Sequence, residues 1–185
     1  KAREDILLAV RQWLSVRGMD FDFPGIIAWR MAGGSILSYK NQEQAIAPYS
    51  EYFLLGGSSD VRGWRAGYLG PYFCQGDTAC ISEDGEQLSM DVVPVGGMTY
   101  LLGTLEYRHY FDDSYGFVVF SDVGRAWSAP KELSLRELQL SLGAGFRYQS
   151  PIGPMRLDVA RRMSNDPYFA QERNWGLHLA FVEAF

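Results

Sequence analysis

The sequence predicts an all-β protein, and more narrowly the wall of an antiparallel transmembrane β-barrel. The first observation is composition: aromatic residues make up 15% of the 185 residues and glycine occurs 20 times, which favours strands joined by tight turns. The second is an alternation of apolar and polar residues that recurs over segments of about ten residues. The third is that no apolar run reaches the roughly 18 residues that a membrane-spanning helix needs.

Seven segments carry the alternation. The clearest is 139–149, in which Leu140 and Leu142 share one face while Ser141 lies on the other. A helix needs apolar residues at spacings of three and four, which this segment lacks. The predicted strands are residues 5–17, 26–39, 99–111, 117–127, 139–149, 155–163 and 174–185.

The polar faces of these segments indicate a wet lumen. Glu106, Asp122 and Asp158 occupy positions that would be core in a soluble β-sandwich, where unpaired charges are costly. In a barrel the charged face meets water and the apolar face meets lipid. Aromatic residues near strand ends fit interfacial girdles; they are Tyr110, Phe111, Trp127, Tyr148 and Trp175. A soluble β-sandwich or a lipocalin-like barrel is the alternative.

We interpret residues 1–185 as one β-barrel domain that contains a long connection, residues 40–98. This connection shows little alternation and is rich in glycine. Loops of that length without secondary structure are usually functional. Membrane barrels keep long loops on the extracellular side, so we expect its tip to be extracellular or folded back into the lumen.

Charge and cysteine content narrow the class further. The formal net charge of −5 gives no strongly basic field, which argues against nucleic-acid binding. Cys74 and Cys80 lie close in a polar loop and predict a local disulfide and an oxidising compartment, the alternative being two unpaired thiols in a cytosolic loop. Both histidines lie far from this pair, so no metal site is expected. Residues 1–10 lack the features of a signal peptide, so we expect a mature chain or a fragment.

Three motifs carry a family resemblance. Residues 55–64 read Leu-Gly-Gly-Ser-Ser-Asp-Val-Arg-Gly-Trp, which resembles the Gly-Gly-x-x-x-Val-Arg-Gly-aromatic signature in the sixth extracellular loop of BamA/TamA/Sam-type outer-membrane assembly factors. Residues 120–124, Phe-Ser-Asp-Val-Gly, resemble the family's Phe-x-Asp-x-Gly motif. Residues 150–154, Ser-Pro-Ile-Gly-Pro, resemble its Pro-Leu/Ile-Gly-Pro turn. The resemblance covers roughly residues 26–185.

The resemblance implies a loop that enters the barrel and is tethered there. Arg62 would pair with Glu106 and Asp122, which the alternation places on the inner faces of adjacent strands. A guanidinium fork suits carboxylates, and a buried cation needs such partners. Gly63 and Gly124 belong to the same tether. The rest of the loop motif consists of Gly56, Gly57, Val61 and Trp64.

The resemblance also implies an activity. Proteins of this family insert or translocate polypeptides, mainly β-barrel outer-membrane proteins, through a seam between the first and last strands that opens laterally. The implied partners are unfolded outer-membrane proteins, outer-membrane lipid including lipopolysaccharide, and periplasmic accessory proteins or chaperones. No covalent chemistry is implied, so we expect no enzyme activity and no cofactor. A β-signal for barrel assembly is expected at Asn174, Gly176, Leu179 and Phe181.

Several alternatives stay open at this point. The resemblance implies that the seven strands are the last seven of sixteen, whereas an unrecognised eighth strand would complete an eight-stranded barrel. A two-partner secretion transporter shares the Arg-Gly-aromatic loop motif. An outer-membrane enzyme needs a nucleophile beside a histidine, and neither His109 nor His178 sits in such a motif. A passive porin has no need of an arginine loop matched to inward carboxylates.

Overall fold

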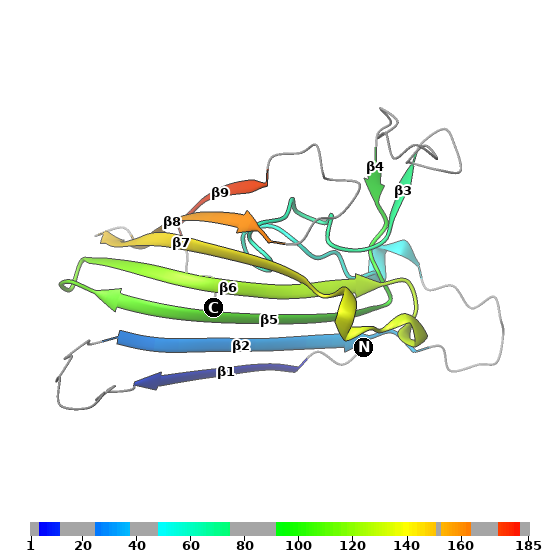
Figure 1. Cartoon of the computed structure of the whole chain (residues 1–185), viewed down its shortest axis with the longest axis horizontal. Coiled ribbons are helices and arrows are strands. Elements are labelled where there is room, and N and C mark those ends of the chain that lie inside the picture. The colour runs from blue at the N-terminus through cyan, green and yellow to red at the C-terminus, as the bar shows by residue number, and fades with distance from the viewer. Residues whose placement is uncertain are drawn as a thin grey trace.

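Seven strands form one antiparallel sheet in the computed structural model of this chain (Figure 1). The structure describes residues 4–11, 25–37, 48–74, 92–150, 153–163 and 174–181. The strands of the sheet are β1 (Glu4–Arg11), β2 (Gly25–Ser35), β5 (Thr99–Tyr110), β6 (Tyr115–Trp127), β7 (Gln139–Ser150), β8 (Gly153–Arg162) and β9 (Trp175–Ala180). Their order in space follows their order in the chain. The predicted all-β antiparallel fold is confirmed.

The strand limits depart from the prediction mainly at turns. β6 begins at Tyr115, because the Asp112 carboxylate accepts hydrogen bonds of 2.7 Å from the N–H groups of Ser114 and Tyr115 and closes the turn early. The predicted end of β2 at residue 39 is wrong, since the strand ends at Ser35. The predicted residues 12–17 and 182–185 lie outside the described part of the chain.

The connection between β2 and β5 contains regular structure of its own. A 3-10 turn, η1 (Tyr49–Glu51), is followed by a hairpin of β3 (Tyr72–Cys74) and β4 (Val92–Pro94), which projects away from the main sheet in Figure 1. Strands of three residues are too short to show alternation, which agrees with the little alternation in this part of the sequence. The predicted Cys74–Cys80 disulfide lies outside the described residues, which include only the backbone of Cys74.

Alternation divides the sheet into an exposed apolar outer face and a buried inner face. On β5, Leu105 is 53% exposed, whereas Thr104 and Glu106 are buried. On β9, Leu177 is 70% exposed and His178, its neighbour in sequence, is half-buried. The predicted facing of these strands therefore agrees with the structure, and an apolar outer surface is what a barrel wall presents to lipid.

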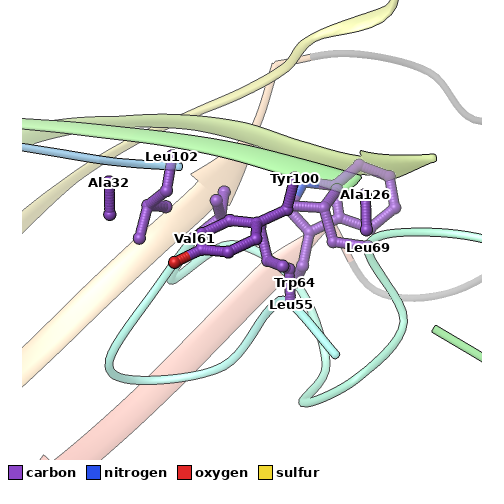
Figure 2. Packing of buried hydrophobic residues seen from close by; sticks show 8 residues of the cluster. All are labelled: Ala32, Leu55, Val61, Trp64, Leu69, Tyr100, Leu102 and Ala126. Atoms are coloured by element: carbon purple, nitrogen blue, oxygen red, sulfur yellow. The ribbon is translucent and has the colours of Figure 1, made fainter. Parts of the chain in front are cut away.

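The largest apolar core lies between the long connection and the inner face of the sheet (Figure 2). Its members are Ala32, Leu55, Val61, Trp64, Leu69, Tyr100, Leu102 and Ala126. Val61 and Leu69 are at most 2% exposed, and burying each stabilises the packed loop by about 1.5–3 kcal/mol. The loop covers this part of the inner face, so the contact here is apolar and does not involve the charged residues on which the prediction of a wet lumen rests.

Two 3-10 turns, η2 (Pro130–Glu132) and η3 (Leu135–Glu137), connect β6 to β7. The Glu137 carboxylate accepts a hydrogen bond of 3.2 Å from the Trp127 indole and forms an ion pair of 3.3 Å with Arg125. Trp127 is only 3% exposed, so its prediction as a girdle residue is wrong. No helical turn in the described residues has the length and apolar character to cross a membrane.

We expect Leu105→Arg to lower the free energy of unfolding in lipid vesicles by about 2–4 kcal/mol, because an arginine near the bilayer midplane must be desolvated. Leu105 lies in the middle of β5 on the outer face. The matched control is Met163→Arg, one residue beyond β8 and also exposed, where the cost falls to about 0–1 kcal/mol. Urea unfolding followed by tryptophan fluorescence measures both, and equal costs would contradict a lipid-facing surface.

Candidate functional site

Residues 56–64 fold into a tight turn. Gly56 and Gly57 have φ angles of 106° and 95°, a region that glycine adopts without strain. The N–H of Gly57 donates to the Trp64 carbonyl at 3.0 Å, and the N–H of Trp64 donates to the Val61 carbonyl at 3.1 Å. These bonds close the segment on itself and fix the backbone on both sides of Arg62.

Small residues on the facing wall leave room for this turn. One row of cross-strand partners runs from β5 to β9 on the inner face: Glu106, Phe120, Gly143, Ala160 and Gly176. A Cβ at Gly176 would lie 2.7 Å from the Arg62 carbonyl oxygen, and one at Gly63 would lie 2.7 Å from Cβ of Ser141. The loop backbone therefore reaches the sheet only because glycine stands on both sides of the contact.

Asp122 holds Arg62 through three hydrogen bonds. Nε of Arg62 donates to Oδ2 at 2.7 Å and Nη2 donates to Oδ1 at 2.8 Å. The backbone N–H of Arg62 donates to the same Oδ2 at 3.1 Å. Arg62 is 2% exposed and Asp122 is fully buried. This bidentate arrangement fixes the guanidinium plane as well as its position.

Two more carboxylates contact the same guanidinium from other strands. Nη1 of Arg62 lies 2.7 Å from Oε1 of Glu106 on β5 and 3.3 Å from Oδ2 of Asp158 on β8. The Phe120 ring lies below the guanidinium, with its centroid 3.3 Å from Cζ, which adds a cation–π attraction. One loop cation is thus bonded to carboxylates on β5, β6 and β8.

Further arginines of the wall share these carboxylates. Arg108 pairs with Glu106 at 2.9 Å, Arg147 bonds to Asp158, and Nη1 of Arg156 lies 3.8 Å from Asp158. Glu106 and Asp158 are fully buried. A buried carboxylate is tolerated only when cations and donors surround it, and this network provides them.

The network also keeps Arg62 charged. Burial by itself lowers the pKa of the Arg62 guanidinium, but its hydrogen bonds to Asp122 and the charges of Asp122, Glu106 and Asp158 outweigh burial and raise this pKa above its ordinary value. Arginine is protonated at all relevant pH in any case. The guanidinium of Arg62 therefore stays charged, and the contact is not lost through loss of the arginine proton.

Additional contacts fasten the backbone of the turn. Arg156 donates to the Ser58 carbonyl at 2.9 Å, and Arg30 on β2 donates to the Ser59 carbonyl at 3.2 Å. The guanidinium of Arg162 stacks on the Trp64 ring at 4.9 Å. On β9, Nε2 of His178 is hydrogen-bonded to the Arg62 carbonyl oxygen.

The structure brings most of the residues singled out in the sequence into this one place. Arg62, Gly63, Glu106 and Asp122 meet there, and Gly124 leaves room for Val61, since a Cβ at Gly124 would lie 3.1 Å from Cγ2 of Val61. The four residues of the predicted β-signal do not share one face of the sheet. Asn174 accepts from Arg162 at 3.2 Å and Gly176 faces Arg62, whereas Leu179 and Phe181 lie exposed on the outer face.

Sequence reasoning did not assign Asp158, Arg147 or His178 to the site. Alternation placed Asp158 and His178 on inner faces, but alternation gives no register between strands. The pairing Asp158↔His178 and Gly145↔Asp158 is what brings them beside Arg62. No signal in the sequence alone fixed that alignment.

The fold and the site together form an antiparallel barrel wall with a loop held on its inner face by one arginine. Residues 17–180 match the family model of the Omp85 superfamily domain, and the chain belongs to this superfamily. Among solved structures it is similar to BamA from Haemophilus ducreyi, crystallised without POTRA domains 1–3, at 19% sequence identity and a TM-score of 0.59. The match covers 83% of this chain and 30% of that one. The seven strands are therefore part of an Omp85-superfamily barrel, and their fold is similar to that of the BamA barrel.

Replacing Arg62 by alanine is expected to cost about 3–5 kcal/mol of stability, because three buried carboxylates lose their shared cation. Arg65→Ala is the matched control: Arg65 is exposed on the same loop and its loss is expected to cost less than about 0.5 kcal/mol. Urea unfolding of the protein in vesicles measures the difference. Adding Asp122→Asn to Arg62→Ala is expected to restore part of the loss, since one uncompensated charge disappears; no recovery would argue against a charge network.

Gly63→Ala is expected to destabilise the docked loop by about 1–3 kcal/mol, because the added methyl overlaps the β7 wall. Adding Ser141→Gly removes the Cβ that lies 2.7 Å away and should recover part of the loss. Trypsin cleavage after the exposed Arg65 reports loop release, with Ser141→Gly alone as the reference. Identical cleavage rates in Gly63→Ala and the wild type would contradict the close approach.

Proposed function

We propose that the protein inserts or translocates polypeptides at the bacterial outer membrane, with β-barrel outer-membrane proteins as its main substrates. Family membership gives the coarse statement of outer-membrane protein insertion or transport. The more specific proposal, which names the substrates, rests on the contacts of the Arg62 guanidinium. On the inner face of the wall it is bonded to carboxylates on β5, β6 and β8. A passive pore does not require a loop held against its inner wall by three carboxylates.

In this proposal the Arg62 contact is a clamp that holds part of the wall in register while another part opens. The strands that carry its carboxylates are ten to thirteen residues long. β9 has six residues and, in the described part of the chain, pairs with β8 alone. An edge strand presents unpaired N–H and C=O groups, to which an incoming polypeptide can add a strand.

The contacts of His178 support the proposal that this activity is not enzymatic. Its Nε2 is hydrogen-bonded to the Arg62 carbonyl oxygen, and Gly176 and Ala180 are the inward residues on either side of it in the strand. The ring therefore acts as a buttress for the loop in this proposal. The proposed partners are unfolded outer-membrane proteins, periplasmic accessory proteins or chaperones, and outer-membrane lipid.

Assembly of a β-barrel substrate in vesicles tests the proposal. The purified protein that carries this chain is reconstituted, and an unfolded outer-membrane barrel protein is added. Folded substrate is measured by its heat-modifiable migration in gels. We expect Arg62→Ala to slow assembly about tenfold or more, which corresponds to a barrier raised by roughly 1.4 kcal/mol or more, while Arg65→Ala assembles at the wild-type rate.

The outcomes separate the proposed function from its alternatives. Wild-type protein that does not accelerate assembly, but exports an added unfolded passenger, would indicate a secretion transporter. Steady ion conductance without either activity would indicate a porin. Equal assembly by Arg62→Ala and the wild type would contradict the role given to the clamp.

A further inference from the structure

An apolar hollow of about 380 Å³ lies between the β6–β7 connection and the sheet. Its principal lining residues are Met31, Leu101, Gly103, Val123, Leu135 and Leu138. The first four belong to β2, β5 and β6, and the two leucines belong to the connection. The clamp does not use any of these residues.

The hollow opens on the outer face of the sheet. On β6, Asp122 and Gly124 face the loop inside, so Val123 and Arg125 face outwards. Glu137 of the connection is bonded to Arg125 and Trp127, which ties residues 128–138 to that outward side. The connection therefore folds back over the apolar surface of the wall.

The same end of the sheet carries the long connection. β5 and β6 are joined at the opposite end by residues 111–114, whereas 36–98 and 128–138 connect strands at this end. Barrels of the outer membrane have short periplasmic turns and long extracellular loops. On the proposed outer-membrane location, on which this inference rests, the hollow lies in the outer leaflet.

The β6–β7 connection, which covers the hollow with Leu135 and Leu138, combines apolar and cationic side chains. Leu133 and Leu135 are 41% and 67% exposed. Lys131 and Arg136 lie beside them in sequence and are exposed as well. Glu137 forms an ion pair with Arg125. Apart from this pair, residues 128–138 carry two cations, Lys131 and Arg136, and one carboxylate, Glu132. Basic side chains on a segment that covers an apolar cleft are complementary to a lipid with an anionic head group.

We propose that this hollow binds one acyl chain of lipid A, the phosphorylated lipid of the outer leaflet, with a phosphate placed against Lys131 and Arg136. Cation–phosphate hydrogen bonds are charge-assisted, and the lining supplies the apolar contacts for the chain. The bound lipid would fasten residues 128–138 to the wall at the membrane surface.

Native mass spectrometry of the purified protein, released stepwise from detergent with added lipid A, tests the proposal. Gly103→Leu fills the hollow and is expected to lower lipid A retention about tenfold, the effect of losing the burial of about two methylene groups. The control Ala144→Leu adds the same side chain to the exposed outer face of β7, away from the hollow, and should retain lipid A as the wild type does.

The second part of the experiment removes charges from exposed residues, and these substitutions are not expected to affect folding. Lys131→Gln with Arg136→Gln is expected to reduce retention of lipid A but not of its dephosphorylated form, whereas Arg161→Gln, exposed elsewhere on the outer face, changes neither. Equal retention of phosphatidylcholine and lipid A by the wild type, or unchanged retention in both test variants, would overturn the proposal. The assay contains no polypeptide substrate, so its result is independent of the assembly experiment, and membrane fractionation tests the location separately.

Discussion

One buried guanidinium organises the inner side of this wall. Arg62 comes from a loop and bonds to carboxylates on β5, β6 and β8, while its backbone carbonyl is bonded to β9. Buried ion pairs are often no more stabilising than apolar contacts, but removing one partner is costly. The contact therefore specifies where the loop lies more than it adds to overall stability.

The rest of the site follows from making that contact possible. The cation needs carboxylates, these need the further cations Arg108 and Arg147, and the loop backbone needs space. Glycine supplies the space at positions 63 and 176, where a Cβ would come within 2.7 Å of the opposing chain. Val61 and Trp64 then pack the flanking loop against an apolar part of the wall.

The two faces of the sheet are consequently used for different purposes. The inner face holds the loop by charge and by apolar packing, and the outer face keeps exposed leucines for contact with lipid. The β6–β7 connection is the exception, because it folds over the outer face and makes an apolar hollow there. The Arg62 clamp lies on the inner side of β5 and β6, and the apolar hollow lies on their outer side. Variants of one are therefore not expected to disturb the other.

The sequence by itself predicted seven strands and, from β5 to β9, which residues face inwards and outwards, because a period of two is a local signal. The pairing of Arg62 with Glu106 and Asp122 was implied by the family resemblance of its motif. The sequence did not determine that Asp158 and His178 join the site, or that Gly143, Ala160 and Gly176 lie in one row of the inner wall, because these depend on the register between neighbouring strands. Trp127 is a similar case: its place at a strand end indicated a girdle, but the connection carrying Glu137 folds onto it. Only tertiary structure decides such contacts, since alternation fixes the face of each residue and leaves its neighbours across the sheet undefined.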